Sequence, residues 1–381
     1  MCCKYLVYLL ILFLTGTSLS CSQKVSVRVL VAEDQSSHLK EIHQSLMQGR
    51  TIGLVNLEKN RSAFRINLDT AIDTMNLPEK TANAFRDRRK STDLYLGVPS
   101  VECAQVAKYI SGTYQIPFIT NGYDDTLVEN VDSVCVFNQN PSHVGKLVAR
   151  YFYFYLKKNK VSLLYDEGIL SNKQMAEGFI QEAGLIGLHI SRNHYNGKSP
   201  KTDFNRILVT MKTWDPDIVF LCLDPVQYDS ALTTMKQVFS TSPMVFLSRA
   251  PREDSLMKNP GLYEALYCIS VFFEQRPTFV QNEFYKQFQK EFNRSPDFYA
   301  AMGYDEIMLI AELIQRKENQ KKGDWFTECK GWKTENRDRY NTGFIGFDLD
   351  GLAQKPIDVL SIRNGKLVFQ NEYWAEISLR R

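Results

Sequence analysis

Two apolar segments in the first half of the chain are followed by side chains that can hold a small polar molecule. Ser100 comes shortly after Leu94–Val98, and Thr120, Asn121 and Tyr123 end or follow the next apolar segment. Hydroxyl and amide groups donate and accept hydrogen bonds, and a tyrosine ring adds an aromatic wall. If both segments are parallel strands, their carboxyl ends share the sheet edge where such folds bind ligands. These four residues are candidate ligand contacts, although Ser100 has an equal claim as a helix cap.

Charged residues occupy comparable positions in the second half. Asp224 and Arg249 follow apolar segments, and Glu274 follows Tyr267–Phe273. A carboxylate at Asp224 or Glu274 would bind an ammonium group, whereas Arg249 would bind an acidic group of a ligand. Asp224 would serve equally well as a helix cap, and an arginine such as Arg249 is more often part of an ion pair at a surface or between domains.

No motif for chemical catalysis accompanies these residues. The sequence has no Gly-x-Ser-x-Gly, no phosphate-binding Gly-x-x-x-x-Gly-Lys and no Gly-x-Gly-x-x-Gly. Its five histidines form no His-Glu-x-x-His or comparable ligand cluster. With 46 basic and 43 acidic residues, it also lacks the positive excess that attracts nucleic acid. We therefore expect a protein that binds a small molecule without catalysis, cofactor, metal or nucleic acid.

The start of the chain has the layout of an export signal. Lys4 precedes the apolar segment Tyr5–Leu14, and small residues lead to Cys21. The apolar segment is too short to span a bilayer as a stable helix. We predict a signal peptide over residues 1–20 and a lipid anchor on Cys21 that holds the protein at a membrane surface. Ordinary cleavage after Ser20 is the alternative, and either route exports the protein to the periplasm or cell envelope.

Five further cysteines follow Cys21, an odd number that does not demand a disulfide framework. Cys222 and Cys268 lie in strand-like segments and are expected to be buried as small apolar residues. Cys103 and Cys135 are one possible disulfide pair.

Apolar segments alternate with segments of helical periodicity, which is the pattern of a parallel α/β sheet. The alternation restarts near residue 143, and this predicts two α/β units of similar size. The Asn364-Gly365 pair between two strand patterns predicts a hairpin. The expected strands are Val25–Ala32, Phe64–Ala71, Leu94–Val98, Ile116–Thr120, Val161–Tyr165, Leu188–Tyr195, Asp217–Leu223, Met244–Leu247, Tyr267–Phe273, Gly343–Asp348, Asp358–Arg363 and Lys366–Phe369.

Four groups of short sequence motifs follow one another in a recognisable order. They are Val161–Asp166 with Met175–Phe179 and Glu182–Gly184, Thr202–Phe204 with Asp215–Phe220, Ser295–Ala301 with Gly303–Asp305, and Thr342–Asp348 with Gly351. In this order they resemble the branched-chain amino-acid type of periplasmic solute-binding protein, whose type I fold is shared with some receptor ectodomains. The resemblance covers the chain from Leu94 to Phe369 and is weaker in the first lobe.

The resemblance implies two Rossmann-like lobes joined by three crossovers. We expect these crossovers near Asn138–Val144, Phe273–Pro277 and Tyr340–Gly343. Lobe one would then comprise residues 21–140 and 275–341, and lobe two residues 141–274 and 342–381.

The resemblance also implies a function. In this family, small hydroxyl residues at two strand ends of lobe one hold the carboxylate of the ligand, and Ser100 and Thr120 match that role. The protein is then expected to capture an amino acid or similar polar molecule between its lobes for the membrane permease of an ABC transporter. Two alternatives stay open: a sensing or adaptor domain that signals to a partner protein, and an envelope scaffold whose cleft is filled by bulky side chains such as Tyr123 or Leu170.

A thermal-shift screen of the mature protein tests solute binding directly. A solute that binds only the folded state raises its stability by about 2.7 kcal/mol at roughly a hundred times Kd. Among amino acids, small carboxylates, amides and peptides, we expect one chemical class to raise the melting temperature, and Ser100→Ala or Thr120→Val to abolish that rise. The absence of a shift with every class would favour the adaptor or the scaffold.

Overall fold

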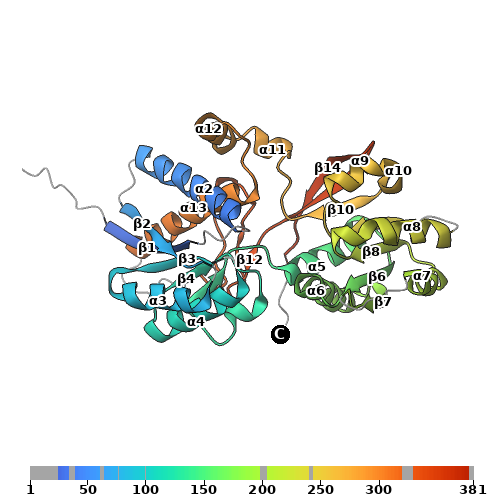
Figure 1. The fold of residues 1–381 in the computed structure, drawn as a ribbon, viewed down its shortest axis with the longest axis horizontal. Helices are drawn as coiled ribbons and strands as arrows, with labels where there is room; N and C mark the ends of the chain where they lie inside the picture. Colours follow the sequence, from blue (N-terminus) through green and yellow to red (C-terminus); the bar gives the residue numbers. More distant parts are fainter. Residues whose placement is uncertain are drawn as a thin grey trace, which may run out of the picture.

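The computed structural model describes residues 25–33, 39–60, 64–75, 77–98, 100–197, 204–239, 243–319 and 329–376. They form two α/β lobes that lie side by side along the long axis of the molecule (Figure 1). The predicted fold class, two Rossmann-like lobes, is confirmed. The predicted signal peptide and Cys21 lie outside the described residues. No described helix is both long and apolar enough to cross a membrane.

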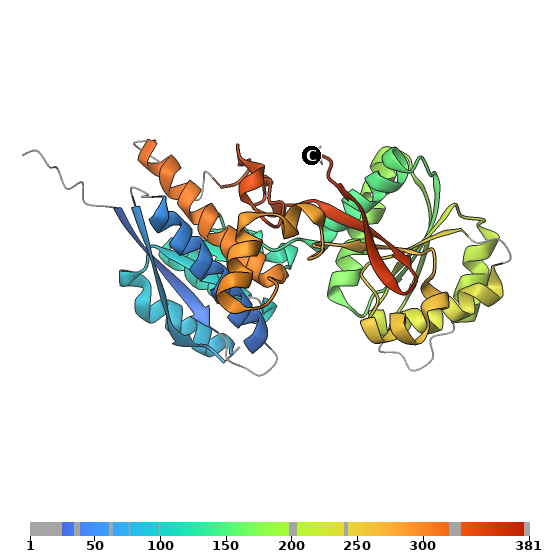
Figure 2. The ribbon, with the colours of Figure 1, turned by 90° about the horizontal axis from the view of Figure 1, so that it is seen from above.

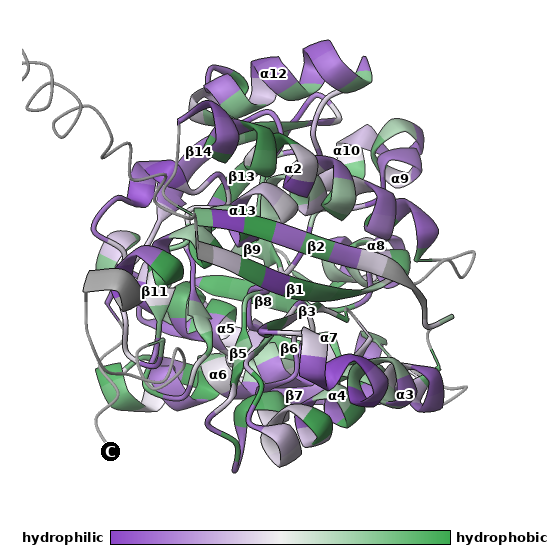
Figure 3. Cartoon of the chain, turned by 90° about the vertical axis from the view of Figure 1, so that its left-hand side faces the viewer, coloured by the Kyte–Doolittle hydropathy of each residue, from purple (hydrophilic) through white to green (hydrophobic). Residues whose placement is uncertain are grey.

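The first lobe is built on a five-stranded parallel sheet in the order β2-β1-β3-β4-β5. Apolar residues cover both faces, as a parallel sheet requires. The edge strand β2 alternates polar and apolar residues, and Figure 3 shows this as alternating colours along the strand. The strands are β1 (Val25–Glu33), β2 (Phe64–Asp73), β3 (Leu94–Gly97), β4 (Phe118–Thr120) and β5 (Val134–Val136). One face carries α2 (Lys40–Lys59) and α13 (Phe298–Asn319), and the other carries α3 (Pro78–Arg88) and α4 (Val101–Tyr114).

The second lobe is built on a seven-stranded sheet in the order β14-β13-β10-β9-β8-β6-β7. Five strands pair in parallel and the last two are antiparallel. Asn364 and Gly365 turn the closing hairpin with positive φ, which confirms the predicted turn. The strands are β6 (Lys160–Asp166), β7 (His189–Tyr195), β8 (Ile218–Cys222), β9 (Met244–Leu247), β10 (Tyr267–Ser270), β13 (Ile357–Arg363) and β14 (Lys366–Tyr373).

Helices cover both faces of this second sheet as well. One core includes residues of α5 (Pro141–Arg150), which continues as the π-helical turn η3 (Tyr151–Tyr155), and of α6 (Leu170–Ile186). The opposite core includes residues of α7 (Phe204–Thr213), α8 (Tyr228–Val238), α9 (Glu253–Lys258) and α10 (Pro260–Tyr263). The helices on the two faces are seen on either side of the sheet in Figure 2.

Three short segments join the lobes. Residues 137–140 lead from β5 to α5, residues 271–276 lead from β10 to α11 (Pro277–Val280), and residues 355–356 lead into β13. The helix α12 (Glu283–Phe292) follows α11 and packs on the first lobe.

The third crossing lies later in the chain than the expected position Tyr340–Gly343. Phe344, Phe347 and Ala353 pack in the core beneath α13, so the chain stays with the first lobe through the small pair β11 (Gly346–Phe347) and β12 (Ala353–Gln354). The apolar residues of the motif Thr342–Asp348 therefore pack in the core of the first lobe, and the chain crosses to the second lobe only after them.

The suggested Cys103–Cys135 pair is not brought together by the fold. Neighbouring side chains of β5 alternate between faces, so Val134 and Val136 face the core around α4 with Cys103, while Cys135 faces the core around α13. The thiol of Cys135 instead contacts that of Cys329. The five described cysteines form no disulfide and are all buried.

Glycine allows α5 and α6 to approach closely. A Cβ atom at Gly178 would lie 2.1 Å from the carbonyl oxygen of Ser142, and one at Gly145 would lie 2.0 Å from that of Met175. Real Cβ atoms do not approach backbone oxygens at such distances, so the two helix backbones would have to separate.

We expect Gly178→Ala to lower the free energy of unfolding by about 1–3 kcal/mol because it overpacks this helix contact. Gly184→Ala, in the same helix, is the matched control, since a Cβ there meets nothing within 4 Å. Alanine at that position should be neutral or stabilise by up to about 1 kcal/mol. Urea unfolding of the two variants measures the difference, and equal effects would contradict the close approach.

Candidate ligand-binding site

The carboxyl edges of the two sheets face each other because of the path of the first crossing. β5 ends at Val136 and α5 begins at Pro141, so the first turn of α5 lies close to the carboxyl edge of the first sheet. α5 then leads back to the start of β6, which places that same turn level with the carboxyl end of β6. A hydrogen bond of 3.3 Å from Gln174 Nε2 to Asp124 Oδ1 joins the two edges directly.

The hydroxyl groups predicted to hold a carboxylate already have partners within the first lobe. Ser100 is the N-cap of α4, where its Oγ accepts from the Cys103 N–H at 3.2 Å. Thr120 Oγ1 donates to the Val98 carbonyl at 3.2 Å and accepts from the Gly122 N–H at 3.0 Å. Thr120 is fully buried. Both residues thus lie at adjacent strand ends, as predicted, and both fix the local backbone.

Asn121 differs from these hydroxyl residues. Its side chain is buried, yet neither Oδ1 nor Nδ2 has a hydrogen-bond partner among the described residues. Its backbone is held at both ends, because its N–H donates to the Gly97 carbonyl and its own carbonyl accepts from Asn138 Nδ2 at 2.9 Å. A buried amide without a partner costs free energy, and a ligand that supplies the missing hydrogen bonds would recover it. Tyr123 follows it and is half-buried.

In the second lobe, Arg249 and Asp224 lie at the carboxyl ends of neighbouring strands. Arg249 follows β9, and its Nη2 donates to Ser171 Oγ at 2.5 Å and to Asn172 Oδ1 at 3.1 Å. Asp224 follows β8 and caps the short turn after it by accepting from the Val226 N–H at 3.0 Å. Asp224 therefore acts locally as a cap, which was the alternative to a ligand contact.

Glu274 is held at the start of α13. It lies on the second crossing and accepts from the Phe298 N–H at the start of α13. Desolvation of its carboxyl, with a smaller contribution from the nearby Asp297 charge, raises its pKa, although the residue as a whole is exposed.

The fold adds residues that sequence reasoning missed. Ser171 and Asn172, in the first turn of α6, hold Arg249, and Gln174 reaches the opposite lobe. The sequence pattern that could have identified these residues is a group of polar side chains at the start of a helix that follows a strand. Leu170, one of the bulky residues expected to fill the cleft in the scaffold alternative, is 44% exposed.

The comparisons with known proteins agree with this architecture. The family model described as periplasmic binding protein matches residues 65–328. The chain belongs to the periplasmic binding protein family. The resemblance read from the sequence is thereby confirmed. No curated relative matches the sequence.

Solved structures of this family share the fold. A putative branched-chain amino acid ABC transporter protein from Rhodospirillum rubrum has a TM-score of 0.76 at 14% identity and covers 91% of this chain and 100% of its own. A leucine-binding protein from Thermotoga maritima has a TM-score of 0.61 at 16% identity, covering 91% and 98%. A substrate-binding protein from Desulfitobacterium hafniense, solved with Leu, has a TM-score of 0.63 at 17% identity, covering 91% and 100%.

Buried charged groups fix the crossings of this periplasmic binding protein. On the second crossing, Arg276 pairs with Asp358 of β13 and Glu372 of β14, and its Nη2 donates to the Asn341 carbonyl at 3.0 Å. Asp305 of α13 accepts from the backbone N–H groups of Asn341 and Thr342, each at 2.7 Å. These bonds tie the second crossing to the segment that precedes the third.

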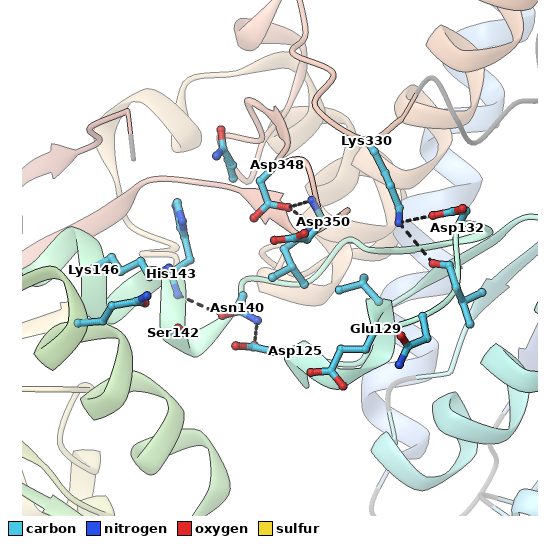
Figure 4. A pocket seen from close by; sticks show the side chains of 16 residues that line it. Asp125, Glu129, Asp132, Asn140, Ser142, His143, Lys146, Lys330, Asp348 and Asp350 are labelled. Atoms are coloured by element: carbon cyan, nitrogen blue, oxygen red, sulfur yellow. Dashed lines mark hydrogen bonds and ion pairs between the residues drawn. The ribbon is translucent and has the colours of Figure 1, made fainter. Parts of the chain in front are cut away.

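A separate cavity of about 690 Å³ opens between the lobes near the first crossing (Figure 4). Asp125, Glu129, Asp348 and Asp350 line it from the first lobe, and His143 and Lys146 of α5 line it from the second. Burial lowers the pKa of His143 to about 4, so its imidazole is neutral at pH 7. No group of side chains in the described part of the chain could hold a metal ion. None of the seven candidate ligand contacts lines this cavity.

Lys355, on the third crossing, is the least compensated charge in the joint. Its Nζ is buried, has no hydrogen-bond partner among the described residues, and lies 4.2 Å from the centre of the Phe137 ring. Burial lowers its pKa to about 8, while the charges of Asp305 and Glu306 act in the opposite direction. The folded protein thus disfavours the ammonium form relative to the unfolded chain, although that form still predominates at pH 7.

We expect Lys355→Met to stabilise the protein at pH 7 by up to about 3 kcal/mol, since each pKa unit corresponds to about 1.4 kcal/mol. Because the folded pKa is the lower one, the cost is present below pH 8 and is relieved as pH rises from about 8 towards 10.5. The advantage of the variant should therefore shrink between pH 8 and 10 in urea unfolding. Lys366→Met, at an exposed position, is the control. A constant advantage across this range would show that the charge is not the cause.

Proposed function

We propose that this protein is an extracytoplasmic solute-binding protein that captures a small polar molecule between its two lobes and delivers it to an ABC-type permease. The facing carboxyl edges, with the buried amide of Asn121 at the first-lobe edge and without a partner among the described residues, carry this proposal. The family supports it, and structures that share the fold include proteins solved with Leu and with benzoate. Binding without catalysis fits the family and the absence of a catalytic motif in the sequence.

The proposed contacts come from both lobes. Asn121 and Tyr123 supply an amide and an aromatic ring from the first lobe, and Arg249 supplies a cation from the second. Ser100, Thr120 and Asp224 shape the strand ends through the hydrogen bonds described above. A solute held by both edges favours the closed arrangement of the lobes, since it gains contacts there that the open arrangement lacks.

We also propose where the lobes begin and end. The packing favours residues 25–138 with 275–354 as lobe one and 139–274 with 355–376 as lobe two. On the second crossing, Phe272 packs with the α11–α12 cluster and Phe273 packs against the second-lobe core, so this segment contacts both lobes on either side of the proposed boundary.

Asn121→Leu tests the capture site without disturbing the fold. Its amide makes no hydrogen bond among the described residues, so we expect the melting temperature of the ligand-free variant to be unchanged or higher. The rise in melting temperature that a solute of the screen causes in the wild type should be lost. Small-angle scattering should show a smaller radius of gyration for the wild type with that solute and no change for the variant.

Asn138→Leu provides the contrast, because Asn138 Nδ2 holds the Asn121 carbonyl and this variant should melt at a lower temperature. If Asn121→Leu retains the full ligand response, the capture site lies elsewhere.

We propose that the exported protein is anchored by a lipid on Cys21. Family membership places it outside the cytoplasm, and the residues before Cys21 allow lipidation or ordinary cleavage. We expect wild-type protein to fractionate with membranes and to incorporate labelled fatty acid, and Cys21→Ser to be released in soluble form. Incorporation of label into Cys21→Ser would contradict the assignment.

A further inference from the structure

We infer that the second lobe binds the acidic group of the solute, through Arg249 and the first turn of α6, and that the ligand is a small carboxylate with its anionic end towards that lobe. This rests on the proposed function and deepens it. The resemblance drawn from the sequence implies the opposite orientation, with the carboxylate on the first-lobe hydroxyls.

Arg249 is positioned and still has donors to offer. Nη2 is used by Ser171 and Asn172, while Nε and Nη1 have no partner among the described residues and are not buried. No described carboxylate forms an ion pair with this guanidinium. The remaining Nε–H and Nη1–H groups can each donate a single charge-assisted hydrogen bond to a carboxylate.

The helix beside Arg249 strengthens the same preference. α6 has 17 residues, and its N-cap, Ile169, offers no side-chain acceptor to the first N–H groups. The positive end of the helix dipole is therefore unneutralised next to the guanidinium. Asn172, in this first turn, is completely buried, and its Nδ2 has no partner among the described residues.

Three carboxylates near this edge of the second lobe, like Asp124 and Asp125 in the first, have partners within their own lobe or across the cleft. Asp166 Oδ1 accepts from the Gly168 and Gly197 N–H groups at 2.9 and 3.0 Å, and Asp224 caps the turn after β8. Glu167 lies 3.8 Å from His194 Nε2, at the far strand β7 of the sheet. Among the described residues near this edge, Arg249 keeps donors free, and Lys173 of the first turn of α6 lies 3.9 Å from Glu177.

The first-lobe edge has the opposite charge. The segments after β3 and β4 contain Glu102, Asp124 and Asp125, which outnumber Lys108 of α4, whose Nζ donates to the Thr126 carbonyl at 2.6 Å. Arg50 is fully buried; its Nε pairs with Glu306 at 2.7 Å, and its Nη2, near Gly97 of β3, has no partner among the described residues. Lys40, at the start of α2, is exposed and follows β1, the strand beside β3 in the sheet. A carboxylate would be repelled at this edge, whereas an ammonium group would be attracted.

Matched acids and amides test this orientation. We would measure the affinities of benzoate and benzamide, isovalerate and isovaleramide, and leucine and leucinamide by calorimetry. We expect at least one acid to bind and its amide to bind at least tenfold more weakly, since charged hydrogen bonds contribute most of the difference. Arg249→Gln should weaken the acid by at least tenfold. Arg252→Gln, which loses an exposed ion pair with Asp254, should bind it within about twofold of the wild type.

The outcomes separate this inference from the proposed function. Acids that bind Arg249→Gln as well as the wild type, or amides that bind as well as acids, would overturn the anion site while solute capture stands. Binding of solutes without an acidic group, and of none with one, would do the same. If no solute of the screen binds the wild type, both ideas fail together. Circular dichroism and the melting temperature of each ligand-free variant confirm that it is folded.

Discussion

The short crossings hold the carboxyl edges of two separate sheets opposite each other, and the rest of the molecule depends on this constraint. Strand ends that would be ordinary loops in an isolated α/β lobe become the two sides of one site. Arg276, bonded at once to β13, β14 and the segment before the third crossing, keeps these connections in register. A chain with longer or looser connections would lose the alignment of the two edges, since flexible linkers do not fix orientation.

Charge is divided unequally across this constraint. The first-lobe edge is acidic, its hydroxyls are used to shape the backbone, and its free donor and acceptor groups belong to the neutral amide of Asn121. The second-lobe edge presents a guanidinium beside an uncapped helix. Under the proposed function, two edges of opposite character would select both the chemistry of a solute and its direction, because a polar solute held between them would have to match both at once.

The region where the lobes are joined contains buried charged residues both with and without hydrogen-bond partners. Asp305 receives several hydrogen bonds, whereas Lys355 on the third crossing is buried without an acceptor among the described residues. Buried charges of this kind reduce stability unless they are fully paired. Lys355 carries this cost on a segment that joins the two lobes, whereas Gly145 and Gly178 lie in the close-packed pair of α5 and α6.

The sequence by itself determined the two α/β lobes, the closing hairpin and the strand ends that carry the site, because these depend on local periodicity, turn residues and short motifs. Tertiary structure decided what local patterns cannot encode. The partner of Cys135 depends on which face of β5 it points to, and the third crossing depends on which core the side chains of Phe344 and Phe347 fill. The roles of Ser100, Thr120 and Arg249 likewise depend on which of their polar atoms already have partners. For Thr120 and Arg249 that is a property of three-dimensional packing, since Val98, Ser171 and Asn172 come from other segments, whereas the Ser100 cap is local.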